Sequence, residues 1–111
     1  MKQPSTKTVI VPAQPGFAVM RYQPGTDAEP ESFQELDVIA WAIMTSEADF
    51  TADASTFVQP VTLEGIEAEG HENVYVVRVP SGQFERAGAA TYATKAAALE
   101  DLGSLYRRLH G

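Results

Sequence analysis

An apolar run over residues 36–44 constrains the fold of this chain more than any other feature. The run reads LDVIAWAIM, so eight of its nine residues are apolar, and it holds the only tryptophan, Trp41. A strand made from this run would be dry on both faces, and a helix would be dry on every side. We therefore expect the segment to lie in the middle of the fold.

Two structures compete for this run. In the first, Pro30 and Glu31 open a helix, because proline is favoured in the first helical turn. That helix would place four apolar side chains at helical spacing: Phe33, Leu36, Ala40 and Ile43. In the second, a short helical turn over residues 30–35 precedes a strand over residues 37–44. The β-branched and aromatic residues of the run favour the strand, whereas its two alanines leave the helix open.

Two segments near the N-terminus have the alternating pattern of β-strands. Residues 6–11 read TKTVIV, and residues 17–22 read FAVMRY. Between them, the sequence PAQPG at residues 12–16 stops the first strand and makes a turn. Because this link is tight, we expect the two strands to pair antiparallel.

Further strands follow in the second half of the chain. Residues 56–63 are extended, but Pro60 cannot donate to a ladder, so we expect an edge strand or a break there. Residues 73–79 alternate most clearly and form the next strand. A hairpin turn with the sequence PSG then returns the chain into a strand over residues 83–86, with Phe84 pointing inward.

A single long helix is expected at the C-terminal end. Thr94 is suited to cap its start, and the helical pattern continues to His110. Six apolar residues form one stripe along it: Ala98, Leu99, Leu102, Leu105, Tyr106 and Leu109. Gly103 costs such a helix about 1 kcal/mol relative to alanine, so we expect close packing there. Arg107, Arg108 and His110 lie at the negative end of the helix dipole, where cations are favourable.

Together these elements predict an α+β fold. We expect an antiparallel, mostly meandering sheet of about four to six strands with the C-terminal helix packed on one face. The length of 111 residues fits a single domain. This domain would be mainly β over residues 6–93 and helical over residues 94–110.

The charge of the chain is unevenly distributed. The net charge is −7, yet residues 22–77 hold twelve acidic residues and no lysine or arginine. The flanking residues 1–21 and 78–111 carry +3 and +2. Because phosphate contacts need cations, the acidic block (residues 22–77) argues against direct binding to nucleic acid. It also argues against binding to anionic membranes.

Cellular location is constrained by what the sequence lacks. The chain contains no cysteine, which excludes disulfides, thiolate nucleophiles and cysteine metal sites. Residues 1–8 lack the apolar segment of a signal peptide, and the longest apolar run is far shorter than the roughly 20 residues that span a bilayer. These features predict a cytoplasmic protein that does not enter a membrane.

The sequence offers no constellation for catalysis. Residues 64–72 gather five side chains of the type that bind divalent cations: Glu64, Glu67, Glu69, His71 and Glu72. They match no calcium-loop or His-Glu-x-x-His pattern, so we expect a solvated acidic loop and keep a weak metal or small-ligand site as an alternative. The sequence has no Gly-x-Ser-x-Gly motif whose serine one of the two histidines, His71 and His110, could activate. We therefore expect no enzyme activity, no cofactor and no metal.

Four sequence blocks stand out together: VIVPAQPGF from residue 9, VIAW from residue 38, PVTLEG from residue 60 and VRVPSG from residue 77. In this order they resemble blocks of small uncharacterised proteins common on bacterial mobile elements. Relatives often carry an aspartate where this chain has Ser81. The resemblance implies a shared fold and a phage, plasmid or integrated-element setting, and it carries no activity with it.

The acidic block predicts a surface that binds another protein. Nine acids approximate a line of phosphates and would be steered onto a basic groove: Asp27, Glu29, Glu31, Glu35, Glu47, Asp49, Asp53, Glu67 and Glu69. Phe50 beside them is suited to anchor an interface. With the resemblance, this predicts a nucleic-acid-handling partner, such as a host defence nuclease inhibited in the manner of anti-CRISPR or anti-restriction proteins. Solubility is the simpler role of such charge, and self-association through the edge strand over residues 57–63 is a further alternative.

Overall fold

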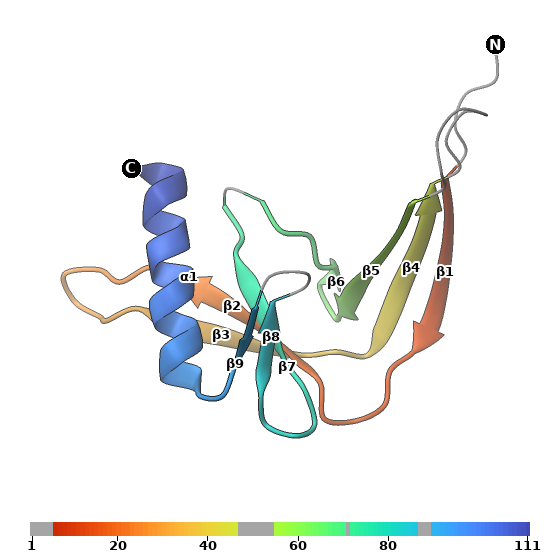
Figure 1. The fold of residues 1–111 in the computed structure, drawn as a ribbon, viewed down its shortest axis with the longest axis horizontal. Coiled ribbons are helices and arrows are strands. Elements are labelled where there is room, and N and C mark those ends of the chain that lie inside the picture. Colours follow the sequence, from red (N-terminus) through yellow and green to blue (C-terminus); the bar gives the residue numbers. More distant parts are fainter. Residues whose placement is uncertain (1–5, 47–54, 71, 87–89) are drawn as a thin grey trace, which may run out of the picture.

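The computed structural model describes residues 6–46, 55–70, 72–86 and 90–111. Over these residues the chain forms nine strands and one helix, α1 (Lys95–His110). The strands make two antiparallel sheets, and α1 packs on one of them (Figure 1). The predicted α+β class is confirmed, although the strands divide between two sheets instead of one meander. No helix in this part of the chain is long and apolar enough to cross a bilayer.

The two sheets lie on opposite sides of the molecule (Figure 1). The five-stranded sheet, beside α1, has the order β3 (Ser32–Asp37), β2 (Ala18–Gln23), β7 (Tyr75–Arg78), β8 (Phe84–Arg86) and β9 (Ala90–Tyr92). The four-stranded sheet has the order β1 (Thr6–Pro12), β4 (Ala40–Ser46), β5 (Ser55–Thr62) and β6 (Gly65–Ile66). It extends away from the helix.

The apolar run over residues 36–44 passes from one sheet to the other. Its first residues end β3 at Asp37, and its last residues form β4 from Ala40 onward. The strand predicted over residues 37–44 is thus confirmed from Ala40, and β4 lies between β1 and β5. The helical turn predicted over residues 30–35 is wrong, because β3 begins within it and pairs along the whole of β2.

The antiparallel pairing predicted between the first two strands is also wrong. β1 pairs with β4, while β2 pairs with β3 and β7. The turn after β1 carries the chain across to the other sheet, beside the segment that links β3 to β4. Two backbone hydrogen bonds join these crossings, from Ala13 N–H to the Ile39 carbonyl at 3.2 Å and from Val38 N–H to the Phe17 carbonyl at 3.1 Å. Two of the segments that link the sheets, β1 to β2 and β3 to β4, are therefore joined to each other by hydrogen bonds.

The hydrophobic core lies between α1 and the five-stranded sheet. Alternate residues of β2 point toward the helix and are buried: Ala18, Met20 and Tyr22. They meet buried side chains from β7, β8 and α1 and from the residue that precedes β7: Val74, Val76, Phe84, Ala98 and Leu102. The opposite face of this sheet looks toward the four-stranded sheet.

The helix begins and packs as predicted. Thr94 Oγ1 accepts a hydrogen bond from the Ala97 N–H at 3.1 Å, which confirms the N-cap. A Cβ at Gly103 would lie 2.8 Å from Glu31 Oε2, so the close packing expected there is confirmed. In the apolar stripe, Leu102 at the centre is buried, whereas Leu109 at the C-terminal end is exposed.

The hairpin between β7 and β8 forms at the predicted residues. The Val79 N–H bonds to the Gln83 carbonyl, and the Gly82 N–H bonds to the Val79 carbonyl, each at 2.9 Å. Gly82 supplies a positive φ of 91°, which a side chain would strain. Phe84 then points into the core, as predicted.

The edge predicted at β5 is present over part of the strand. β5 pairs with β4 along its length, but with β6 only at Val61 and Thr62. The Pro60 carbonyl accepts the Glu67 N–H at 2.8 Å, so the proline nitrogen, which has no hydrogen, also faces away from β4. No other described strand pairs with this side of β5.

Candidate functional site

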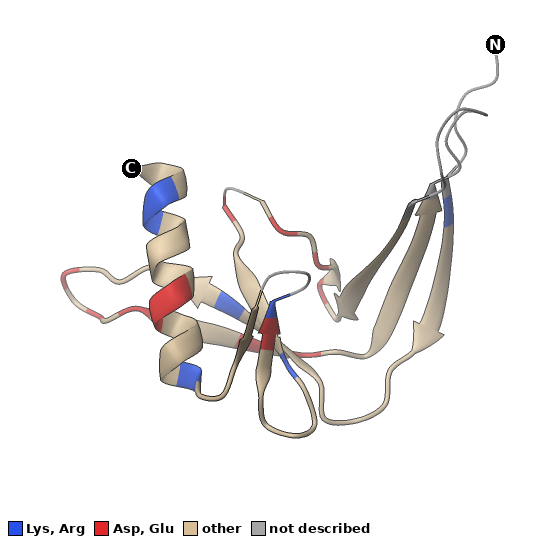
Figure 2. Cartoon of the chain, in the orientation of Figure 1, with Lys and Arg blue, Asp and Glu red and all other residues tan. Residues whose placement is uncertain are grey.

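The described acids of the predicted binding surface come from several separate segments. There are six of them: Asp27, Glu29, Glu31, Glu35, Glu67 and Glu69. They are spread over the β2–β3 loop, β3 itself and the segment between β6 and β7 (Figure 2). Four predicted site residues lie outside the described part of the chain: Glu47, Asp49, Phe50 and Asp53.

Arginines from outside the acidic block neutralise part of it. Arg21 precedes the block and pairs with two of its acids, Glu64 and Glu67. Three arginines that follow the block pair with one acid each: Arg78 with Glu35, Arg86 with Glu69, and Arg107 with Glu31. The charge asymmetry of the sequence is therefore reduced in the fold by contacts between residues distant in the chain.

Glu67 is the acid most firmly held. Its side chain is only 2% exposed, and it accepts hydrogen bonds from Arg21 Nε at 2.7 Å, Arg21 NH2 at 2.6 Å and Asn73 Nδ2 at 2.7 Å. Burial alone would raise the pKa of Glu67, but the bonds from Arg21 and Asn73 outweigh it and lower that pKa. The prediction that Glu67 belongs to a solvated surface is wrong, because its charge serves an internal ion pair.

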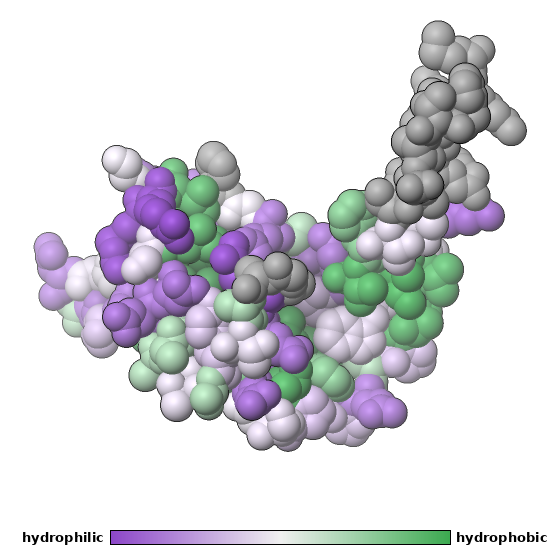
Figure 3. Space-filling model, viewed as in Figure 1, coloured by the Kyte–Doolittle hydropathy of each residue, from purple (hydrophilic) through white to green (hydrophobic). Residues whose placement is uncertain are grey.

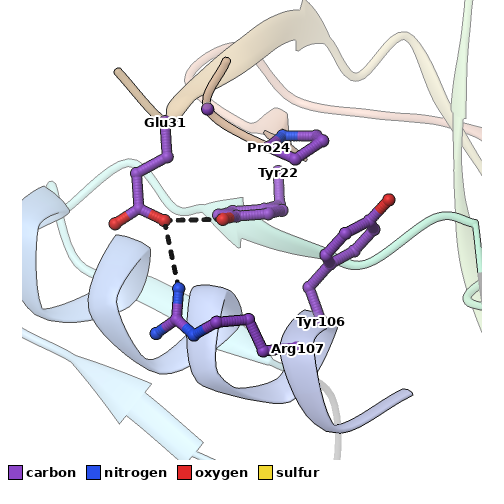
Figure 4. Close-up of a pocket in the computed structure, with 6 residues that line it drawn as sticks. Tyr22, Pro24, Glu31, Tyr106 and Arg107 are labelled. Atoms are coloured by element: carbon purple, nitrogen blue, oxygen red, sulfur yellow. Dashed lines mark hydrogen bonds and ion pairs between the residues drawn. The ribbon is translucent and has the colours of Figure 1, made fainter. Parts of the chain in front are cut away.

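Glu31 joins the β2–β3 loop to the helix (Figure 4). It accepts a hydrogen bond from the Tyr22 hydroxyl at 2.5 Å and lies 3.8 Å from Arg107 NH1. Burial and the bond to Glu31 raise the pKa of Tyr22 to about 12. A depression of about 390 Å³ lies here, which Pro24 and Tyr106 also line. Its polar groups bond to one another, so this site acts to hold the loop in place.

A cleft of about 210 Å³ lies between the two sheets. One wall comes from β4 and β5, where Trp41 and Pro60 are cross-strand partners on the same face. The other wall comes from β7 and β8. The lining consists of apolar and aromatic side chains and two carboxylates: Trp41, Val58, Pro60, Tyr75, Val77, Glu69 and Glu85.

Both aromatic rings of the cleft are fixed by their neighbours. The Phe17 ring packs edge-on against Trp41, with centroids 5.1 Å apart and planes at 86°. The Tyr75 hydroxyl donates to the Glu67 carbonyl at 3.5 Å. Burial, with the nearby charges of Glu67 and Glu69, raises the pKa of Tyr75 to about 12, so its phenol is neutral at neutral pH. The two rings therefore give the cleft a largely apolar lining, and each ring has a contact with a neighbouring residue.

Two carboxylates line the cleft, and one of them, Glu69, is paired with an arginine. Glu69 accepts a hydrogen bond from Arg86 NH2 at 2.8 Å, whereas Glu85 is exposed on β8, opposite Val77 of β7. Aromatic rings attract cations, and the carboxylate of Glu85 adds negative charge to the same lining. This arrangement suits a cation carried on an apolar stem, which describes a lysine or arginine side chain.

A metal site over residues 64–72 gains no support from the described residues, in which no group of three His, Cys, Asp or Glu side chains could hold an ion. Glu67 is taken by Arg21 and Asn73. His71 lies outside the part of the chain that the structure describes.

Sequence reasoning found only part of the cleft. Glu69 was among the predicted site residues, and Trp41 was expected in the middle of the fold. Tyr75 and Glu85 were missed as site residues. A usable signal existed for Tyr75: residues 74–77 read VYVV and are apolar on both faces, so a strand covered by the helix on one side needs a second cover on the other.

A scan of protein-family models, a search of curated proteins and a search of solved structures gave no match to this chain. The mobile-element setting therefore stays a prediction from sequence.

Proposed function

We propose that this protein is a non-catalytic binding module that captures a basic segment of another protein. The observation that carries the proposal is the cleft between the sheets, where Trp41 and Tyr75 lie beside the carboxylates of Glu69 and Glu85. The stem of a captured lysine or arginine packs on the two aromatic rings. Its cation contacts these rings and the carboxylate of Glu85.

The expected strength of a single captured side chain is modest. A cation–π contact contributes about 0.5–1 kcal/mol at an exposed site and about 2 kcal/mol when desolvated. An exposed ion pair with Glu85 adds about 0.2–1 kcal/mol. The net charge of −7 attracts a cationic segment over a longer range. Useful affinity therefore requires a segment with several basic residues.

A nucleic-acid-handling protein is the partner class that we propose, since such proteins expose clustered lysine and arginine. Capture of a single basic side chain does not need a row of acids at phosphate spacing. If the captured segment also contacts nucleic acid, binding would block that contact. Inhibition of a host defence nuclease is the form of this proposal that fits a mobile-element setting.

Trp41 fluorescence tests the proposal directly, because the chain has no other tryptophan. The protein is titrated with a hexa-arginine peptide and, as a matched probe, a hexa-citrulline peptide of the same shape without the charge. We expect a saturable change with hexa-arginine that weakens as salt rises. We expect no saturable change with hexa-citrulline. Absence of saturation with hexa-arginine at low salt would refute capture at the cleft.

Two charge-removing variants separate the cleft from net charge. Glu85→Gln should weaken hexa-arginine binding about two- to fivefold, as the loss of an exposed ion pair does. Glu100→Gln removes the same charge from an exposed position on α1, outside the cleft lining, and should leave the affinity unchanged. Equal weakening by both variants would show that the peptide follows net charge alone.

A further inference from the structure

The strand β1 forms an outer edge of the four-stranded sheet. It pairs with β4 over its whole length, and no described strand lies on its other side. In an antiparallel ladder, alternate residues direct both backbone groups toward the same neighbour. The Ala13 N–H bonds to Ile39 on the β4 side, so the odd-numbered residues of β1 face β4. Thr8 and Ile10 therefore direct their N–H and C=O groups outward.

The side chains of this edge are apolar on both faces of the sheet. Val9 and Ile10 point to opposite faces and are 56% and 53% exposed. Figure 3 shows hydrophobic residues gathered on this sheet. Edge strands are usually protected by charged residues, prolines or bulges. Here Lys7 and Pro12 flank the strand centre, and the residues between them carry no such protection.

The charge pattern favours a second copy of the chain at this edge. The strands β1, β4 and β5 contain one charged residue, Lys7 (Figure 2). Two copies of a protein with a net charge of −7 repel each other at most surfaces. They can approach through the four-stranded sheet, because β1, β4 and β5 contain no carboxylate.

The other side of the same sheet is less suited to pairing. β6 and the Glu67 N–H already occupy the outer side of β5 near its C-terminal end. Pro60 offers no N–H there. The longer free edge therefore belongs to β1, and not to the strand that the sequence marked as an edge.

We propose that two copies of this chain join through the outer edges of β1, paired antiparallel about a two-fold axis near Val9. This interface is independent of the cleft. Thr8 of one copy exchanges backbone hydrogen bonds with Ile10 of the other, and Lys7 lies opposite Val11, so the two ammonium groups do not face each other. The joined sheet is continuous across both copies, and the symmetry closes the assembly at two chains.

Sedimentation equilibrium at protein concentrations from about 1 μM to about 1 mM tests for the dimer and covers dissociation constants in the same range. The mass of the wild-type protein should rise to that of two chains. Ile10→Lys should raise the dissociation constant about tenfold or more, because the symmetry introduces the charge twice. Leu63→Lys is the matched control, since Leu63 is 90% exposed in the turn between β5 and β6. It should leave the constant unchanged.

Amide hydrogen exchange of the wild-type protein provides a second test that needs no variant. Exchange at Thr8 and Ile10 should slow as the concentration rises, whereas Val9, whose N–H faces β4, should not change. A monomer over the whole range, or equal weakening by Ile10→Lys and Leu63→Lys, would overturn the proposal. A dimer in which Thr8 and Ile10 exchange at the monomer rate would also overturn it.

Discussion

Replacing Glu67 by glutamine removes the charge from the most buried ion pair of the described chain. The substituted side chain would keep the size of the original, but it would present an amide to Arg21 where two charged hydrogen bonds now lie, at 2.6 and 2.7 Å. Arg21 would retain Glu64, at 3.1 Å. The variant therefore tests how much stability depends on one buried carboxylate.

The expected loss in the free energy of unfolding follows from the burial of this ion pair. Breaking a buried ion pair costs about 3–5 kcal/mol, because one charge is left without compensation. The Arg21 side chain is 19% exposed and keeps a second partner, which places the loss near the lower end, at about 3 kcal/mol. With a denaturant slope of roughly 1.5 kcal/mol per M of urea, the unfolding midpoint should fall by about 2 M.

Glu64→Gln is the matched control for urea unfolding. It removes a carboxylate from the same arginine, but Glu64 is 52% exposed. An exposed pair of this kind contributes at most about 1 kcal/mol. If Glu67→Gln lowers the unfolding free energy no more than Glu64→Gln does, the reasoning from burial is refuted.

The same pair predicts the acid sensitivity of the protein. The pKa of Glu67 is lower in the folded than in the unfolded chain, so its contribution is complete above the unfolded value of about 4.3. The contribution is lost as the pH falls through the folded pKa. The unfolding free energy of the wild-type protein should therefore fall more steeply below about pH 4.3 than that of Glu67→Gln.

Two further predictions concern the helix and the tyrosines. Gly103→Ala should gain about 1 kcal/mol of helix propensity but lose more by displacing the Glu31 carboxylate, which would lie 2.8 Å from the new Cβ. Urea unfolding should therefore show a net loss of about 1 kcal/mol in the free energy of unfolding. A net gain would contradict the close packing. The pKa values of Tyr22, Tyr75 and Tyr92 are each raised to about 12 by burial. The contribution of these neutral phenols to the free energy of unfolding should therefore be complete below their unfolded pKa of about 10 and should be lost as the pH rises toward 12. The absorbance change from the phenols of Tyr22, Tyr75 and Tyr92 should therefore coincide with alkaline unfolding. Titration of these three phenols near pH 10 in the folded protein would contradict it.

Local patterns in the sequence were sufficient for individual elements. Alternation predicted β1 and β7, and the stripe with Thr94 at its start predicted α1. These signals are local because a strand or helix needs its apolar residues on one face at a fixed period. The close packing at Gly103 was predictable for a similar reason, since a glycine within a helix is costly unless a neighbour approaches.

The division into two sheets was not predictable by the same means. Val38 and Ile39 cross between the sheets, yet both are as apolar as the strand that follows them. Neither hydropathy nor period marks the crossing, so the run looked like a single element. The pairing of β1 with β4 depends on contacts between distant residues, which a period within one segment does not encode.

The candidate site could be predicted only in part, for a related reason. Trp41 and Tyr75 come from different sheets, so only the folded chain brings them to one cleft. Counting charge along the sequence treated every acid as free. In the fold, Arg21 and Glu67 are 46 positions apart and form a largely buried pair, so the count overstated the exposed negative charge.

The order of synthesis determines when each acid of the ion pairs described above can meet its arginine. A chain leaves the ribosome with its N-terminal residues first. When the acidic block has emerged, Arg21 is the only one of the four pairing arginines already available. Glu35, Glu69 and Glu31 acquire their counterions in turn, from Arg78, Arg86 and finally Arg107. Once Glu72 has been added, the residues synthesised up to that point carry +3 and −12, a net charge of −9, and Arg107 of α1 supplies the last of these counterions.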